Sequence, residues 1–387
     1  SPTIQLAAQS ALIGLRGAVV VMDPRTGGVL AMASSPGFDA ATFVTAGVER
    51  ERAALFTNPQ KPLLNRAIQG AYPPGSTFKM VTLSAAIGEG LTNANDVFFD
   101  PGYWDGLGAG YRKTCWLKTG HGRIGLQDGL TASCDIVFYE LGKRLDAKGQ
   151  SILAQYATRF GYGARTGVEL PGEVTGNSPD PAWKKQRVGE VWTPGDTVNF
   201  SIGQGFMLAT PLQVTQMTAA IANGGNLLRP SLVAGTAEAG AAPKASPPVK
   251  TGTLPTPQAL SLIQKGMLGV TTNASLGTAT YRFAEFEYYL VDGRWTPGKT
   301  LTAAQRQTAQ RLTVAGKTGT AETGTADKPY AWFTAYAPAA DPQLAITVLI
   351  ENIGEGSTFA APRARQIIEA SFGLPISELP KDVKATE

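Results

Sequence analysis

Histidine, cysteine and long apolar runs are all scarce in this sequence. The chain has one histidine, His121, and two cysteines among its 387 residues. A catalytic set of serine, histidine and aspartate would therefore have to use His121, and the cysteines allow one disulfide at most. The longest apolar run, LAITVLI at 344–350, is the size of a strand and falls short of the ~18 residues that span a bilayer.

The charged residues lack any block of one sign. The chain has 34 basic and 30 acidic residues, a net charge of +4, and both kinds are spread along its length. Without a lysine or arginine cluster there is no nucleic-acid footprint, and the mild basicity is compatible with an anionic cell-envelope setting. The chain begins without Met or a signal-peptide pattern, so we expect a processed chain or a soluble piece of a longer protein.

Strand patterns occur at both ends of the chain. GAVVVMDPRTGGVLAMAS at 17–34 predicts a β-hairpin, because two apolar runs flank a turn rich in Asp, Pro and Gly. Three more strands are predicted at 314–322, 331–338 and 344–352. The middle of the chain is largely helical. We therefore predict an α+β fold with an antiparallel five-stranded sheet flanked by helices.

The predicted domain organisation follows from this pattern. The sheet is expected from 16–36 and 312–353, with a helical subdomain inserted at roughly 60–230, all within one domain spanning 1–387. Helices are predicted at 4–15 and 362–373, the second ending at Gly373. The Ala/Pro/Gly-rich segment 237–257 is predicted to be a surface loop, and 281–311 an inserted hairpin and helix.

The stretch YPPGSTFK at 72–79 places Lys79 three residues after Ser76, in the first turn of a predicted helix. A lysine there opposes the helix dipole, and a capping box would use Glu or Gln instead. A serine hydroxyl is a weak nucleophile until a base removes its proton, and His121 lies near neither residue in sequence. We therefore predict Ser76 as a nucleophile and Lys79 as its base, kept neutral by the helix N-terminus, burial and a second cation.

Two further short motifs follow in order. Ser133-Cys134-Asp135 lies in a break between helical stretches, and Lys317-Thr318-Gly319-Thr320 lies on a predicted strand. Each motif alone is weak evidence, but their order matches the S-x-x-K, S-D-N and K-T-G set that penicillin-binding proteins and serine β-lactamases share.

The chemistry of that set assigns a role to each residue. Lys317 would be the second cation, Ser133 would relay a proton to the leaving amine, and Asp135 would hold Lys79 or the substrate amide. The backbone N–H groups of Ser76 and Thr320 would form the oxyanion hole. Gly319 would keep the strand edge bare for an extended peptide, while Thr318 and Thr320 would bind the terminal carboxylate of the substrate beside Lys317.

Nearly the whole chain resembles the transpeptidase domain of class B penicillin-binding proteins. Besides the three motifs, the resemblance rests on RGAVVVMDPRTGGVLAMASSP, NRAIQGAYPPGSTFK, GHGRIGL, FGYG, IGQGFMLATPLQ and AGKTGTAE. Asp135 stands where most relatives have Asn. Together with Gly120-His121-Gly122, this makes the chain most similar to the subfamily of the rod-elongation machinery.

The resemblance implies a reaction and a setting. Ser76 would attack the D-Ala-D-Ala bond of a peptidoglycan stem peptide, and an amine from a neighbouring stem would accept the acyl group to form a cross-link. β-Lactams would acylate Ser76, and catalysis would need no cofactor. The expected partner is the membrane glycan polymerase of the elongation complex, on the extracytoplasmic side of the inner membrane. The family's membrane anchor and pedestal are absent from these residues, so we expect an excised catalytic domain.

Both cysteines and the histidine fall within one short segment, as Cys115, His121 and Cys134. Such ligands suit a tetrahedral Zn²⁺, which an oxygen of Asp100 or Asp105 would complete, Asp100 being preferred. A closed site of this kind would be structural and would brace the loop that carries Ser133. Two alternatives remain open: a disulfide between the cysteines, or buried thiols with a histidine that is only hydrogen-bonded.

Other functions are compatible with the same three motifs. A serine β-lactamase needs a base that activates water, such as Glu-x-x-x-Asn after the second motif, and neither Glu169 nor Glu173 has that pattern. A D,D-carboxypeptidase would differ only in using water as the acceptor. A β-lactam sensor or a non-catalytic scaffold would keep the fold, but the intact motifs argue against a scaffold.

Overall fold

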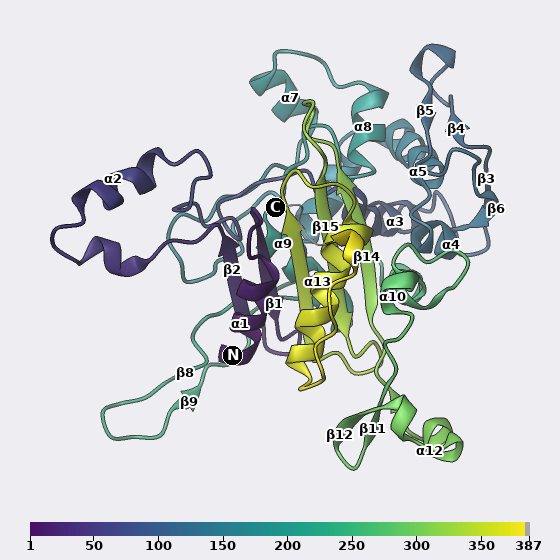
Figure 1. Cartoon of the computed structure of the whole chain (residues 1–387). Coiled ribbons are helices and arrows are strands. Elements are labelled where there is room, and N and C mark those ends of the chain that lie inside the picture. The colour runs from purple at the N-terminus through teal and green to yellow at the C-terminus, as the bar shows by residue number, and fades with distance from the viewer. Residues whose placement is uncertain (384–387) are drawn as a thin grey trace.

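The chain is built around a five-stranded antiparallel sheet in a computed structural model that describes residues 1–383 (Figure 1). The strand order is β14-β15-β16-β1-β2. The strands are β1 (Gly17–Met22), β2 (Val29–Ser35), β14 (Ala315–Ala321), β15 (Tyr330–Ala337) and β16 (Leu344–Ile350). The N-terminal hairpin thus joins the three C-terminal strands, which confirms the predicted α+β class. β14 lies at one edge of the sheet, so only one side of it is paired within the sheet.

Helices cover both faces of this sheet. On one face lie α1 (Pro2–Ala11) and α13 (Gly356–Ser371), and α9 (Pro211–Ala222) packs on the other (Figure 1). All six residues of β1 are buried, as expected for a continuous apolar strand whose two faces are both covered. Every residue of α9 is buried as well, so α9 is the central helix between the sheet and the helical part of the chain.

The helical part supplies the second wall of the site. Its core is formed mainly by helices between residues 79 and 222, and α10 packs against both α4 and β14. The remaining helices are α2 (Glu49–Thr57), α3 (Lys79–Gly88), α4 (Leu126–Thr131), α5 (Asp135–Lys148), α6 (Ile152–Arg159), α7 (Pro181–Arg187), α8 (Pro194–Phe200), α10 (Pro257–Thr272), α11 (Thr280–Phe283) and α12 (Ala303–Thr308). No helix within residues 1–383 has the length and hydropathy that a membrane span requires.

Short strand pairs make up the rest of the structure. They are β3 (Val97–Asp100) with β6 (Gly122–Gly125), β4 (Tyr103–Trp104) with β5 (Lys113–Thr114), β7 (Asn226–Leu228) with β10 (Lys250–Thr253), β8 (Gly235–Thr236) with β9 (Lys244–Ala245), and β11 (Tyr288–Val291) with β12 (Arg294–Pro297) and β13 (Gln310–Arg311). The predicted hairpin and helix at 281–311 are confirmed as β11, β12 and α12. This segment, α2 and the β8–β9 hairpin stand away from the body of the molecule (Figure 1).

The predicted start of the closing helix is wrong by six residues. α13 begins at Gly356, so Pro362 lies inside the helix and not at its first turn. Proline removes one helical hydrogen bond and usually breaks a helix interior. Here Ala360 and Ala361, which precede the proline, are fully buried in the core under the sheet. Their burial favours the earlier helix start in spite of the missing bond.

Candidate active site

Ser76 lies in a 3₁₀ turn, η2 (Gly75–Phe78), that leads directly into α3. Gly75 has φ of +55°, and a Cβ added there would lie 2.9 Å from the carbonyl oxygen of Thr320. Only glycine therefore lets this turn pack so closely against β14. The indole N–H of Trp332 donates to the carbonyl of Pro73 at 3.0 Å and anchors the chain just before the turn. The half-buried Ser76 side chain is thereby fixed beside the edge strand.

Lys79 is the first residue of α3 and is fully buried, in the first turn where the sequence predicted it. Its Nζ donates to the carbonyl oxygen of Ser133 at 2.7 Å, to Ser133 Oγ at 3.3 Å and to Asp135 Oδ1 at 2.7 Å. Of the two partners foreseen for Asp135, the free protein therefore uses Lys79. No hydrogen bond joins Lys79 Nζ to Ser76 Oγ in the described part of the chain. Such bonds often form only when substrate is bound.

Lys317, on β14 of the sheet, also contacts Ser133. Its fully buried Nζ donates to Ser133 Oγ at 2.8 Å and to the carbonyl of Thr318 at 3.0 Å. The pKa of Lys317 is held well below its usual range, mainly by burial and secondly by the charge of Lys79. The charge of Asp135 acts in the opposite direction and raises this pKa. Two lysines from distant segments thus converge on one hydroxyl oxygen.

The loop between α4 and α5 carries Ser133, as the sequence predicted. Ser133 has φ of +54°, a left-handed conformation that is uncommon for a residue other than glycine. Residues held in such conformations cost about 1–3 kcal/mol and cluster at functional sites. The strained backbone here directs both the carbonyl and the hydroxyl of Ser133 toward the Lys79 ammonium.

A cleft of about 780 Å³ brings the predicted residues together. It is lined by Ser76, Ser133 and Asp135 on one side and by Thr318 and Thr320 of β14 on another. The two lysines lie buried behind this surface. The unpaired edge of β14 provides backbone groups with which an extended peptide can pair.

Gly319 also has a packing role that the sequence did not indicate. A Cβ at this position would meet Trp332 Cβ at 3.0 Å, Thr77 Cγ2 at 3.1 Å and the carbonyl oxygen of Pro74 at 3.2 Å. All three belong to the packing between the sheet and the Ser76 turn. The glycine therefore lets that turn approach β14 closely, in addition to leaving the strand edge without a side chain.

Sequence reasoning missed two residues that hold the site. The backbone N–H of Trp116 donates to Asp135 Oδ2 at 3.1 Å, and its indole N–H donates to the carbonyl of Ala132 at 3.0 Å. Its position directly after Cys115 was the only available signal. The Thr278 hydroxyl shares a hydrogen bond of 2.7 Å with the Thr318 hydroxyl, and no local pattern marked Thr278.

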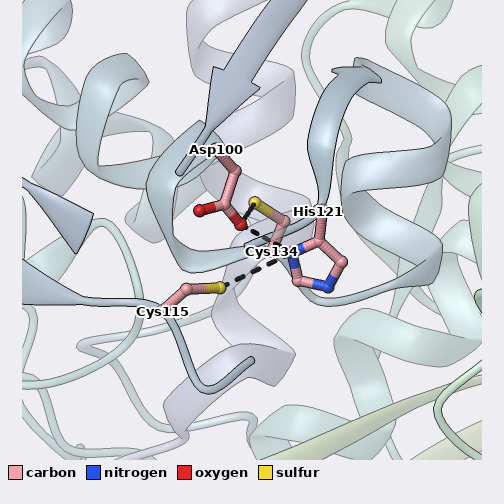
Figure 2. Close-up of side chains that lie close together, drawn as sticks. All are labelled: Asp100, Cys115, His121 and Cys134. Carbon is pink, nitrogen blue, oxygen red and sulfur yellow. Dashed lines mark hydrogen bonds and ion pairs between the residues drawn. The ribbon is translucent and has the colours of Figure 1, made fainter. Parts of the chain in front are cut away.

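Asp100, Cys115, His121 and Cys134 form a second cluster, in which one potential ligand atom from each lies within 4.8 Å of the others (Figure 2). The distances are 3.6 Å from Cys115 Sγ to His121 Nδ1, 3.2 Å from Cys134 Sγ to Asp100 Oδ2, and 2.6 Å from His121 Nδ1 to Asp100 Oδ2. Both cysteines are free and buried. Asp105, the other aspartate that was considered, forms an ion pair with Arg112 at 3.6 Å instead.

Hydrogen bonds within the cluster shift the pKa values of its four side chains. A hydrogen bond from Cys134, assisted by one from His121, lowers the pKa of the Cys115 thiol to about 5, and the shared proton raises the pKa of Cys134. Burial alone would raise the pKa of Asp100, but hydrogen bonds from His121, the Gly102 N–H and the cysteines lower it. Burial likewise opposes a charged His121, yet bonds to Cys115 and Asp100 raise its pKa. Asp100 and Cys115 therefore gather negative charge at a buried point, and His121 offsets part of it.

The cluster adjoins the cleft at two places in the backbone. Cys134 lies between Ser133 and Asp135, and Cys115 precedes Trp116, whose N–H binds Asp135. Anything that fixes the two cysteines thus also fixes the residues around the Lys79 ammonium.

Comparisons with known proteins point in one direction. Residues 17–369 match the family model described as "Penicillin binding protein transpeptidase domain". The peptidoglycan D,D-transpeptidase MrdA of Haemophilus influenzae is 37% identical over 384 residues, which are 98% of this chain and 57% of the relative. This chain therefore spans little more than half of that relative's length.

Two solved structures are similar over almost the whole chain. Pseudomonas aeruginosa PBP2 in complex with WCK 5153 has a TM-score of 0.82 and 33% identity, and the match covers 100% of this chain and 77% of that one. A structure described as "Structural coordination of polymerization and crosslinking by a peptidoglycan synthase complex" has a TM-score of 0.78 and 32% identity, and the match covers 97% and 62% of the two chains.

Proposed function

This chain belongs to the penicillin-binding protein transpeptidase family, and from that premise we propose that it cross-links peptidoglycan through an acyl-enzyme on Ser76. Its residues 1–387 act as one D,D-transpeptidase domain. The substrate is a stem peptide that ends in D-Ala-D-Ala, and the acceptor is an amine of a neighbouring stem. The observation that carries the proposal is the convergence of Lys79 and Lys317 on Ser133 Oγ, at the wall of the cleft that Ser76 lines.

The buried lysines would move the protons. As a neutral amine, Lys79, one turn beyond Ser76, takes the proton of the serine hydroxyl as that oxygen attacks the carbonyl carbon. Ser133 Oγ is within hydrogen-bond distance of Nζ of both lysines, so it passes the proton that Lys79 has gained on to the leaving D-Ala amine. Lys317 donates a hydrogen bond to Ser133 Oγ from the side of the sheet, and Asp135 holds Lys79 in place. The same groups act in reverse when the acceptor amine attacks the acyl-enzyme.

The edge strand would orient the peptide. The stem peptide pairs with β14 as an added strand, and its terminal carboxylate lies near Thr318, Thr320 and Lys317. The N–H groups of Ser76 and Thr320 stabilise the oxyanion. The close packing of the Ser76 turn on β14, where Gly75 approaches the Thr320 carbonyl, supports this pairing of donors.

The carboxylates that would suit a β-lactamase are used elsewhere. Glu169 accepts hydrogen bonds from Ser231 and from the Leu232 N–H, and Glu173 accepts from Thr166. Neither glutamate lines the cleft. This arrangement favours slow release of a β-lactam acyl group over rapid hydrolysis, and thus a transpeptidase over a β-lactamase.

Intact mass after incubation with benzylpenicillin tests the function. We expect one covalent adduct per chain that persists for many minutes after free drug is removed, because neither Glu169 nor Glu173 lines the cleft, where it could activate water for deacylation. Loss of the adduct within seconds would indicate a β-lactamase. Failure to form any adduct with correctly folded protein would indicate a scaffold and would overturn the proposal.

The setting and partner are inferred from the relatives. We place the enzyme in the bacterial cell envelope, on the extracytoplasmic side of the inner membrane, in cell-wall elongation and the maintenance of cell shape. Relatives named MrdA and PBP2 support this subtype. The partner would be a membrane glycan polymerase of the elongation complex, and the similarity to a chain from a peptidoglycan synthase complex supports that pairing.

The four-residue cluster would hold a structural Zn²⁺. Zinc bonds of about 2.0–2.3 Å place tetrahedral ligand atoms roughly 3.3–3.8 Å apart. The separations of 3.6 Å and 3.2 Å that involve the cysteine sulfurs lie close to that range, and the shorter 2.6 Å fits a direct hydrogen bond between His121 and Asp100. Two thiols, one imidazole and one carboxylate are a donor set that zinc prefers. The metal would supply no chemistry to the reaction and would brace the backbone at Ser133 and Trp116.

Metal analysis and thiol counting test this second role. Untagged protein dialysed against metal-free buffer should keep about one equivalent of zinc, and Cys134→Ser should lose most of it because one sulfur ligand is gone. Thiol titration after denaturation should find both cysteines reduced. Zinc well below one equivalent with both thiols free would dismiss the idea, and zinc-free protein without free thiols would establish the disulfide.

A further inference from the structure

The segment 111–118 gives the cleft a cationic wall. Arg112, Lys113 and Lys118 all line it. Arg112 is paired with Asp105 at 3.6 Å and lies over the Tyr103 ring. Lys118 Nζ donates to Thr114 Oγ1 at 2.7 Å.

Lys113 differs from these two neighbours. It is half-buried, and its Nζ lies 5.3 Å and 5.4 Å from the ring centroids of Tyr111 and Tyr139. Within residues 1–383, neither a hydrogen-bond acceptor nor a carboxylate lies within bonding distance of this ammonium. Aromatic faces attract the charge but leave its three N–H donors without acceptors. An anion in the cleft would therefore gain charge-assisted hydrogen bonds from a group that is already partly desolvated.

The ammonium also stands on a rigid support. Lys113 belongs to β5, where it pairs with Trp104 of β4. The next turn of backbone is held by the Cys115 N–H, which donates to the Gly102 carbonyl at 3.0 Å. Because the backbone is held in this way, binding of a ligand to Lys113 loses little loop entropy.

We propose that Lys113 binds a second carboxylate of the peptide substrate, distinct from the terminal carboxylate assigned to Thr318 and Thr320. The inference rests on the proposed function, which places a peptide in this cleft. In the proposed function, Thr318 and Thr320 of β14 bind the terminal carboxylate. Lys113 lines the same cleft as Ser76 but belongs to a different segment, so it is free to bind another carboxylate. The substrate therefore carries a further carboxylate close to the reacting amide. This carboxylate belongs either to the donor peptide or to the strand that brings the acceptor amine.

The first arm of the test uses two donor peptides that end in D-Ala-D-Ala and carry Glu or Gln immediately before it. The two differ only in a carboxylate against a carboxamide. The release of D-Ala gives kcat/KM for each, and a donor-side subsite predicts at least about a tenfold preference for Glu, the size of one charge-assisted hydrogen bond. Lys113→Met, which keeps the apolar stem on the tyrosine rings, should reduce the ratio to within about twofold.

The second arm uses the acceptor. The same acyl-enzyme is offered D-glutamate or D-glutamine, which differ only in a side-chain carboxylate against a carboxamide, and the yield of amide product relative to hydrolysis is measured. An acceptor-side subsite predicts that Lys113→Met lowers the D-glutamate yield about tenfold while the D-glutamine yield changes much less. A change confined to one arm assigns the carboxylate to that strand.

Lys118→Met is the matched control, because it removes the same charge from the same wall. It should keep the ratios of the parent protein, and thermal unfolding should show that all variants are folded. If benzylpenicillin labels the parent protein but Lys113→Met alters neither ratio, or Lys118→Met alters them equally, the subsite does not exist and the transpeptidase proposal stands. If the parent protein is not labelled, the proposed function fails and the subsite fails with it.

Discussion

Replacing Ser76 with alanine is expected to abolish the covalent adduct with benzylpenicillin entirely. The side chain of residue 76 is the only serine hydroxyl at the turn that packs on β14, and the bond to the β-lactam carbonyl carbon cannot form without its oxygen. Intact-mass spectrometry should show the unmodified mass after a long incubation, where the parent protein is fully converted. Turnover of a D-Ala-D-Ala peptide should fall to the level of the buffer.

Ser84→Ala is the matched control for that experiment. Ser84 lies on the same helix, α3, and its hydroxyl donates to the carbonyl of Pro255 at 3.2 Å, away from the cleft. Its loss should cost about 1 kcal/mol of stability and leave the adduct intact. An adduct on Ser76→Ala protein would show that another residue is the nucleophile, and peptide mapping would identify it.

The fold was predictable because its sheet is encoded near the two ends of the chain. β1 is apolar throughout, since both of its faces are covered, and the Asp-Pro-Arg-Thr-Gly-Gly turn marks its hairpin. The strands at 315–321, 330–337 and 344–350 carry similar signals. The start of α13 was not predictable, because a local rule for Pro362 competed with the burial of Ala360 and Ala361 against the sheet, and burial is a tertiary property.

The candidate site was predictable in its residue types but not in its hydrogen bonds. Lys79 stood out because it opposes the helix dipole, and the structure buries it against Asp135 at 2.7 Å. No local pattern could choose between the Lys79 ammonium and a substrate amide as the partner of Asp135. The bonds from the Trp116 N–H to Asp135 and from Thr278 to Thr318 join segments that are far apart or differently structured. Such contacts follow from tertiary packing alone.

The cysteine and histidine cluster is an intermediate case. The short spacing from Cys115 to Cys134 predicted that these side chains meet, and they do. The choice of Asp100 over Asp105 depends on the pairing of β3 with β6, which places Asp100 opposite Gly122 and beside His121. The sequence contains both strands but does not give their register. Asp100 was therefore preferred only because Asp105 lies in a glycine-rich stretch.

Lys79 is the residue whose loss should most reduce the rate of acylation without removing the nucleophile. Lys79→Met removes the proposed base and leaves the Asp135 carboxylate without its ion-pair partner. General-base catalysis contributes about 10²–10⁴-fold, and the lost positioning of Ser133 adds to that, so we expect acylation by benzylpenicillin to slow by about 10³-fold or more. Stopped-flow or timed mass spectrometry gives the second-order rate constant.

Two further variants separate proton transfer from charge and from misfolding. Lys79→Arg keeps a cation beside Asp135 and so protects the fold, but a guanidinium cannot give up its proton in a protein. If Lys79 is the base, the arginine variant should be nearly as slow as the methionine variant. Lys148→Met is the control for lysine removal, because Lys148 is exposed and bonds only to Glu89, through an ion pair at 3.2 Å and a hydrogen bond to its carbonyl at 2.7 Å, and exposed pairs contribute little. An arginine variant that retains a tenth of the parent rate would contradict the assignment, because Lys79 would then act through its charge and some other group would take the proton of Ser76.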